Sequence, residues 1–207
     1  MSAITLAVLG DSIAYGQGAT RVEDTVGRRL GTALTAEGVA TKVRVLAVPG
    51  ARSEALAAQV RRALAFDPDV ALIIIGANDL TRFVAPDVAA GQLSTAVRDL
   101  RAAGAEVVVA PAPDLSAVPW VPEQFRSLVR AGSAVLRAAQ ARTALAAGAL
   151  VADVDGATAR AFAADTTLFS ADRFHPSSAG YALISQALLP AVRAAAARAR
   201  AGDRDVG

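Results

Sequence analysis

Short apolar runs alternate with longer amphipathic stretches along this chain, and the alternation restricts its possible folds more than any other feature. Segments such as ALIIIG and VVVA are continuously apolar, which is typical of strands buried on both faces of a parallel sheet. Strands are expected at Ile4–Leu9, Lys42–Val48, Val70–Ile75, Glu106–Ala110 and Leu150–Val154. Helices are expected over about residues 22–37, 53–65, 87–103, 122–147 and 177–200. The pattern predicts the α/β class, as a three-layer α/β/α sandwich of five parallel strands with right-handed crossovers.

The length and composition fit one domain spanning residues 1–207. Hydrophobic residues make up 54% of the chain, which is enough to bury a sizeable core and excludes global disorder. We expect an ordered core over about residues 4–200 and a flexible tail over 201–207. Scattered alanines raise the hydropathy, but no run of ~18 purely apolar residues occurs, so no stable membrane insertion is expected.

The net charge and the N-terminal sequence indicate whether the chain binds nucleic acid and in which cellular compartment it is expected. The formal net charge is only +2, and acidic residues partly offset the arginines near the C-terminus, so nucleic acid is not an expected partner. The opening MSAITLAVLGDS has no basic region and is interpreted as a first strand, not as a signal peptide. The chain as written is expected in the cytoplasm, or outside the cell if a leader was removed ahead of it. The sequence does not predict an oligomeric state.

The chain has no cysteine and one histidine, His175. A disulfide scaffold, thiolate catalysis and a multi-histidine metal centre are therefore excluded. His175 follows Asp172 by three residues in DRFHPSSAGY, so one loop can supply a base and the carboxylate that fixes its tautomer. The same spacing also fits a surface histidine at a helix start or, less well, two metal ligands.

Ser12 directly follows the first expected strand, in LGDSIAYGQG. The carboxyl ends of parallel strands meet at one rim, where ligands bind. A serine there becomes a nucleophile when a neighbouring base takes its proton. The glycines after Ser12 also fit a phosphate cradle, although neither a Lys-Ser/Thr pair nor dinucleotide spacing follows. A flavodoxin-like module that binds phosphate or a nucleotide is therefore the non-enzyme alternative.

Two further loops at the same rim carry hydrogen-bond donors. Asn78, in IIIGANDL, follows the most hydrophobic strand, and its amide can donate to an oxyanion. Gly50, in AVPGARS, offers a backbone N–H with no side chain in the way. Taken singly, both also fit ordinary turns, and Asp79 and Asp114 are interpreted as turn or helix-cap residues.

Together, the segments GDSIAYG, PGARS, GAND and DRFHP resemble, in order, the four blocks of the SGNH hydrolases, also called the GDSL esterase/lipase family. The resemblance extends from residue 4 to the final helix and implies a flavodoxin-like sheet with strand order 2-1-3-4-5. It implies Ser12 as the nucleophile, His175 as the general base and Asp172 as the residue that orients the base. The implied oxyanion hole consists of the Ser12 N–H, the Gly50 N–H and the Asn78 side chain.

The resemblance implies a serine esterase that cleaves carboxylic esters through an acyl-enzyme, with small-molecule esters as partners. The short loops of the chain favour small or flexible acyl groups. It implies no cofactor and no metal. Ile13 replaces the usual leucine after GDS, and Gly50 lies in VPG instead of after an asparagine, but neither departure removes a reacting atom. The alternative within the same chemistry is an acyltransferase, or a deacetylase acting on a sugar or a secondary metabolite.

The substrate pocket is the least determined part of the prediction. The proline-rich loop APAPDLSAVPWVPEQF holds Trp120, the chain's one tryptophan. Trp120, Leu80, Phe83 and Phe174 are candidate pocket residues, and ordinary half-buried packing is the competing interpretation for each of them. The short loops predict an open, shallow cleft.

Overall fold

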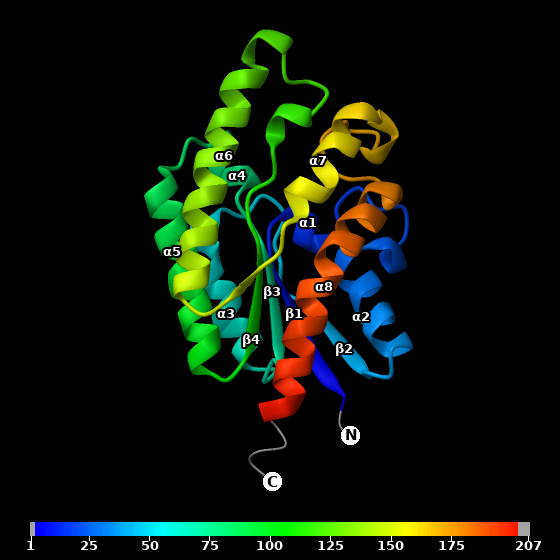
Figure 1. Cartoon of the computed structure of the whole chain (residues 1–207), viewed down its shortest axis with the longest axis vertical. Coiled ribbons are helices and arrows are strands. Elements are labelled where there is room, and N and C mark those ends of the chain that lie inside the picture. Colours follow the sequence, from blue (N-terminus) through cyan, green and yellow to red (C-terminus); the bar gives the residue numbers. More distant parts are fainter. Residues whose placement is uncertain (1–2, 203–207) are drawn as a thin grey trace.

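A computed structural model describes residues 3–202, in which five strands form one sheet with helices on both faces (Figure 1). The strands are β1 (Ile4–Gly10), β2 (Thr41–Val45), β3 (Val70–Ile74), β4 (Glu106–Ala110) and β5 (Leu150–Val151). All neighbouring strands pair in parallel, in the order β2-β1-β3-β4-β5. The predicted class, layers and strand order are confirmed.

The helices divide between the two faces of the sheet (Figure 1). One face is covered by α2 (Val26–Ala36), α7 (Val154–Ala164) and α8 (Ser178–Gly202). The other is covered by α3 (Leu56–Leu64), α5 (Pro86–Ala102) and α6 (Glu123–Ala146). Two short helices, α1 (Ser12–Tyr15) and α4 (Ala77–Thr81), directly follow strands β1 and β3. Single 3₁₀ turns lie at η1 (Val22–Asp24), η2 (Ser53–Ala55), η3 (Leu115–Ala117) and η4 (Thr166–Leu168).

Alternate residues of the central strands build two separate cores. Leu6 and Val8 of β1 pack in the cluster that contains α2 and α8, whereas Ala7 and Leu9 pack in the cluster that contains α3 and α5. Every residue of β3 is buried. The uninterrupted apolar runs therefore reflect burial on both faces, as predicted. β2 is an edge strand with exposed positions.

Three strands end earlier than the sequence predicted: β3 ends one residue early, at Ile74, and β2 and β5 end three residues early. β2 ends at Val45 because the N–H groups of Leu46 and Ala47 both bond to the Val8 carbonyl, which interrupts the regular ladder. β5 ends at Val151, and α7 begins at Val154. The sequence analysis missed α7.

The last helix continues to Gly202, two residues past its expected end. The expected flexible tail otherwise falls on residues 203–207, outside the described part of the chain. Within residues 3–202, no helix combines the length and the apolarity needed to span a membrane.

Candidate active site

Ser12 lies at a sharp turn between β1 and α1. Gly10 has a φ of +132°, and a Cβ there would lie 1.8 Å from the Ile74 carbonyl oxygen, so only glycine fits where β1 presses against β3. Asp11 caps α1, and its carboxylate accepts the Ile13 N–H at 2.9 Å. This turn presents Ser12, which is 5% exposed, at the carboxyl end of the sheet.

The structure brings Ser12, His175 and Asp172 together. Ser12 Oγ lies 3.0 Å from His175 Nε2, and His175 Nδ1 lies 2.6 Å from Asp172 Oδ2. A carboxylate can only accept a hydrogen bond, so this contact places the proton of a neutral imidazole on Nδ1. Nε2 is then free to accept the serine proton.

Asp172 is held as an ionised acceptor. Its Oδ1 accepts the N–H groups of Phe174 and His175 at 2.9 Å each and the Ser170 hydroxyl at 2.8 Å. Burial raises the pKa of the Asp172 carboxyl, but the hydrogen bonds from the His175 ring, from the two backbone N–H groups and from Ser170 outweigh it and hold this pKa well below its usual range. The carboxylate thus stays charged beside the imidazole.

The loops that carry Ser12 and His175 pack directly against each other. Gly18 has a φ of +94°, and a Cβ there would lie 2.5 Å from the Pro176 carbonyl oxygen and 3.0 Å from His175 Cβ. Gly18 therefore makes room for the histidine loop instead of contributing to an open phosphate cradle.

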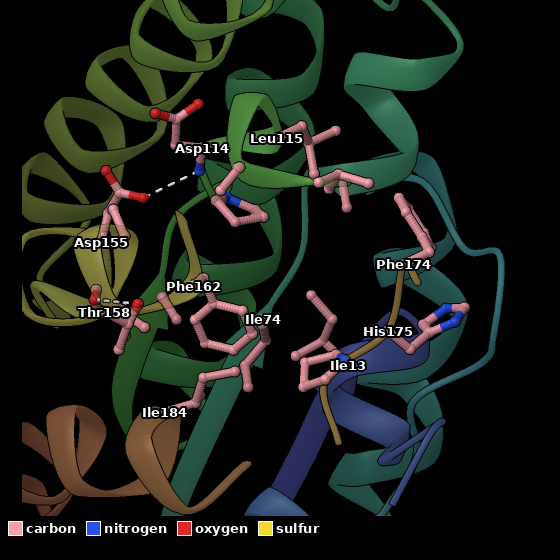
Figure 2. A pocket seen from close by; sticks show the side chains of 18 of the residues that line it. Ile13, Ile74, Asp114, Leu115, Asp155, Thr158, Phe162, Phe174, His175 and Ile184 are labelled. Atoms are coloured by element: carbon pink, nitrogen blue, oxygen red, sulfur yellow. Dashed lines mark hydrogen bonds between the residues drawn. The ribbon is translucent and has the colours of Figure 1, made fainter. Parts of the chain in front are cut away.

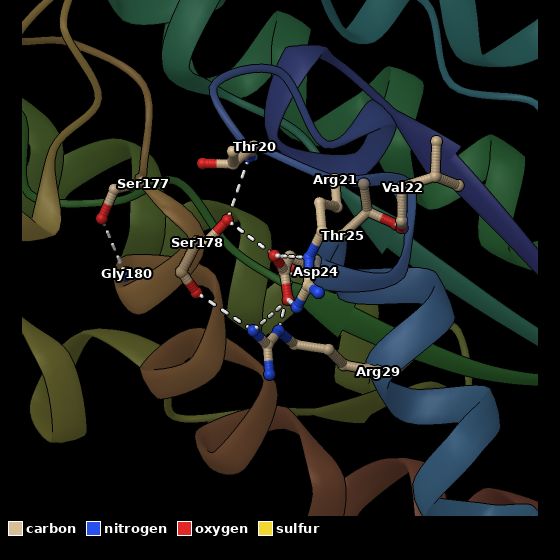
Figure 3. A network of polar contacts seen from close by, with 9 residues as sticks. All are labelled: Thr20, Arg21, Val22, Asp24, Thr25, Arg29, Ser177, Ser178 and Gly180. Carbon is tan, nitrogen blue, oxygen red and sulfur yellow. Dashed lines mark hydrogen bonds and ion pairs between the residues drawn. The ribbon is translucent and has the colours of Figure 1, made fainter.

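A polar network ties the start of α8 to the loop ahead of α2 (Figure 3). The Ser178 hydroxyl donates to Asp24 at 2.9 Å, and Arg29 donates to Asp24 at 2.7 Å and to the Ser178 carbonyl at 3.3 Å. Hydrogen bonds from Arg21 and Ser178 lower the pKa of Asp24. Because Ser178 lies three residues after His175, the network anchors the histidine loop on its C-terminal side.

The two loops that carry the expected oxyanion donors are joined to each other. Asn78, in α4, donates from Nδ2 to the Ala51 carbonyl at 3.0 Å. The buried Asp79 accepts the Ser53 N–H at 3.1 Å and the Ser53 hydroxyl at 2.9 Å. Gly50 has a φ of +79°. A carboxamide has two N–H donors, so the Asn78 side chain can hold Ala51 and still donate to a substrate.

An apolar cavity of about 100 Å³ opens beside Ser12 and His175 (Figure 2). Residues from the ends of β3 and β4, the loop after β4, α7 and α8 line it. Asp114 and Asp155 also contribute to the lining, and the Asp114 N–H donates to Asp155 at 3.0 Å. α7 supplies a wall of this cavity that the sequence analysis did not include.

Of the four predicted pocket residues, only Phe174 lines this cavity. Trp120 packs against Phe174 with ring centroids 5.6 Å apart, but it lies outside the cavity and is half exposed. Leu80 packs into apolar clusters with Ala77 and Leu136, and Phe83 is 94% exposed. Trp120, Leu80 and Phe83 therefore do not line this cavity, and their contact with a substrate stays a prediction.

A family model described as the GDSL-like lipase/acylhydrolase family matches residues 8–183, a span that includes all four motif loops. The chain belongs to this family. The resemblance inferred from the sequence is thus confirmed. One relative, the GDSL-like esterase Rv1075c of Mycobacterium tuberculosis, is 35% identical over 194 residues, which is 92% of this chain. The chain spans only 62% of the length of that relative.

Solved structures share the fold. TesA is similar with a TM-score of 0.74 and 22% identity, over 92% of this chain and 99% of that one. LAE5, an alpha/beta hydrolase enzyme from the metagenome of Lake Arreo, Spain, has a TM-score of 0.75 and 22% identity, over 92% of this chain and 96% of that one.

Sequence reasoning missed the residues that fix the motif loops of this GDSL-like protein. The buried Gln59 of α3 accepts the Gly10 N–H at 2.7 Å and donates to the Gly10 carbonyl at 2.9 Å. The sequence indicates a turn or helix-cap role for Asp79, but in the structure its carboxylate accepts hydrogen bonds from the Ser53 N–H and the Ser53 hydroxyl. The available signal for Gln59 was a polar residue on the apolar face of an amphipathic helix.

Within the described residues, no cluster of three or more His, Cys, Asp or Glu side chains could hold a metal ion.

Asp11 makes the stability of this GDSL-like protein depend on pH. Burial raises the pKa of its carboxyl to about 7, and the nearby Asp79 adds to the effect against opposing backbone hydrogen bonds. Between about pH 4 and pH 7, the folded protein keeps a proton that the unfolded chain has released, so the free energy of unfolding falls as the pH rises. The linked loss is on the order of 4 kcal/mol.

An asparagine side chain cannot ionise. We therefore expect the free energy of unfolding of Asp11→Asn not to show this fall as the pH rises. Urea unfolding at several pH values between 4 and 7 measures the difference between the wild-type and variant curves. Asp87→Asn changes an exposed carboxylate in α5 and serves as the matched control. Parallel curves for wild type and Asp11→Asn would show that Asp11 does not retain its proton in the folded state.

Proposed function

We propose that this GDSL-like protein hydrolyses carboxylic esters through an acyl-enzyme intermediate formed on Ser12. The observation that carries the proposal is the continuous contact from Ser12 Oγ to His175 Nε2, at 3.0 Å, and from His175 Nδ1 to Asp172 Oδ2, at 2.6 Å. A serine, a base and an orienting carboxylate in this geometry suit acyl transfer. Family membership and the esterase relative support the same chemistry.

In the first half-reaction, Ser12 Oγ attacks the ester carbonyl carbon while His175 Nε2 takes the hydroxyl proton. The carbonyl oxygen becomes an oxyanion, which the Ser12 and Gly50 N–H groups and the Asn78 amide stabilise. The C–O bond to the alcohol then breaks, and the alcohol oxygen takes the proton from His175. Asp172 stabilises the imidazolium that forms between these two proton transfers.

In the second half-reaction, water attacks the acyl-enzyme carbonyl while His175 takes one of its protons. The resulting oxyanion collapses, the bond to Ser12 Oγ breaks, and His175 returns the proton to the serine. The products are a carboxylic acid and the free enzyme. An alcohol in place of water would give transfer instead of hydrolysis.

Fluorophosphonate labelling tests the nucleophile. We expect turnover of p-nitrophenyl butyrate and, by intact mass, one covalent adduct that peptide mapping places on Ser12. Ser12→Ala should take up no label, whereas the control Ser127→Ala, at an exposed position of α6, should label as wild type does. An adduct that persists in Ser12→Ala would contradict the proposal. Product analysis with added alcohols separates hydrolysis from acyl transfer.

The side chain of Asn78 is expected to stabilise the oxyanion of the transition state. Removal of one oxyanion donor typically lowers kcat on the order of 10²–10³-fold, and we expect this loss for Asn78→Ala with little change in KM. Because Asn78 also binds the Ala51 carbonyl, Ala51→Gly provides a control for altered packing of the neighbouring loop. A kcat for Asn78→Ala within about threefold of wild type would exclude Asn78 from the oxyanion hole.

A further inference from the structure

One face of α7 forms a wall of the cavity beside Ser12. Val154, Asp155, Thr158, Ala159 and Phe162 all line the cavity, and their spacing of three or four residues places them on the same side of the helix. Figure 2 shows Thr158 and Phe162 across the cavity from Ile13 and His175. None of these α7 side chains takes part in the proposed proton transfers.

Phe162 is held in place by packing. Its ring meets the Phe169 ring edge to face, with centroids 5.0 Å apart and planes at 75°, which is a favourable geometry for two aromatic rings. On the α8 side, a Cβ at Gly180 would lie only 2.9 Å from Phe162 Cζ, so the ring tip lies directly over the α8 backbone. The ring is therefore a rigid boundary of the cavity.

The proposed reaction favours the acyl group over the alcohol as the occupant of this cavity. The alcohol leaves after the first half-reaction and water takes its place. The part of the site that holds the alcohol must therefore be open to solvent. The acyl group stays attached to Ser12 through both steps. The cavity that begins at Ser12 is apolar. It therefore suits the acyl group, which stays attached to Ser12, and is a poor route for the incoming water.

The size of the cavity limits the chain that fits. A protein cavity of about 150 Å³ holds benzene, a molecule of six carbons, so a cavity of about 100 Å³ corresponds to roughly four aliphatic carbons beyond the carbonyl. On the basis of the proposed esterase function, we infer that Phe162 is the specificity-determining residue that ends the acyl pocket and restricts the substrates to short aliphatic acyl esters.

The test compares kcat/KM for p-nitrophenyl acetate, butyrate, hexanoate, octanoate and decanoate. For wild type, we expect a rise of about fourfold per added methylene up to butyrate or hexanoate, and a fall for octanoate and decanoate. Phe162→Ala removes the six ring carbons, so its maximum should move to octanoate or decanoate. Ala159→Leu fills the cavity instead and should lower the ratio of kcat/KM for hexanoate to kcat/KM for acetate by roughly tenfold or more.

Phe125→Ala is the matched control, because Phe125 is half exposed on α6 and does not line the cavity; its chain-length profile should equal that of wild type. An unchanged profile in both Phe162→Ala and Ala159→Leu, with esters still cleaved, would overturn this inference alone. A preference that follows the alcohol in a series of alkyl acetates would also overturn it. Absence of turnover by wild type on every ester would overturn the esterase proposal and this inference with it.

Discussion

Alanine in place of Ser12 or His175 is expected to lower kcat on the order of 10⁶-fold. The two side chains lie 3.0 Å apart and exchange one proton in the proposed reaction, and His175 has no substitute, because it is the chain's one histidine. The double variant Ser12→Ala/His175→Ala should lose no more than either single variant, since the nucleophile and its base act as one unit. Burst and steady-state kinetics on p-nitrophenyl butyrate measure these losses.

Circular dichroism and thermal unfolding establish that the variants are folded, and Ser127→Ala controls for the loss of a hydroxyl. Losses that multiply in the double variant would show that Ser12 and His175 act independently, which the proposed proton transfer does not allow. A single alanine variant that retains more than about one-thousandth of the activity would contradict the assignment of that residue.

Asp172→Asn is expected to lower kcat on the order of 10⁴-fold, and the hydrogen bonds of Asp172 give the reason. Oδ1 accepts three donors, the N–H groups of Phe174 and His175 and the Ser170 hydroxyl, so the oxygen of an asparagine would take this position. Its NH₂ group would then face His175 Nδ1, which would have to accept a hydrogen bond. The imidazole proton would move to Nε2, and the base could no longer take the proton of Ser12.

The measurement is kcat and KM for Asp172→Asn, with Asp87→Asn as a matched control at an exposed site. We expect KM to change little, because the backbone of the histidine loop keeps its hydrogen bonds. A loss below about tenfold in kcat would show that the tautomer of His175 does not depend on Asp172.

The sheet and the grouping of Ser12, His175 and Asp172 could be predicted because the local sequence determines the strands and the loops that carry these residues. A continuously apolar strand such as β3 must be buried on both faces, and parallel strands place their following loops at one edge. Ser12 and Asn78 directly follow β1 and β3, whereas the His175 loop comes after α7 and η4, and the structure brings Ser12 and His175 into contact. Asp172 and His175 share one loop, so their contact needed no long-range information.

The cavity could not be predicted because it depends on packing between distant segments. α7 follows a strand of only two residues, and its cap at Asp153, which accepts the Gly156 N–H at 2.9 Å, is a local signal that a helix begins there. Whether Phe162 or Phe83 faces a cavity depends on the partners of each ring. Phe162 meets Phe169 and α8, whereas Phe83 is almost wholly exposed.

The 163 positions between Ser12 and His175 have a consequence for the protein during its synthesis. Ser12, the proposed nucleophile, and the proposed oxyanion donors leave the ribosome first, together with the strands that position them. His175, the proposed base, arrives only with the loop ahead of α8, and that loop is anchored once Ser178 meets Asp24 and α8 packs across the sheet. A nascent chain with β1 to β4 already paired therefore has Ser12 without His175 beside it, and in the proposed mechanism ester cleavage can begin only when the C-terminal helix has docked.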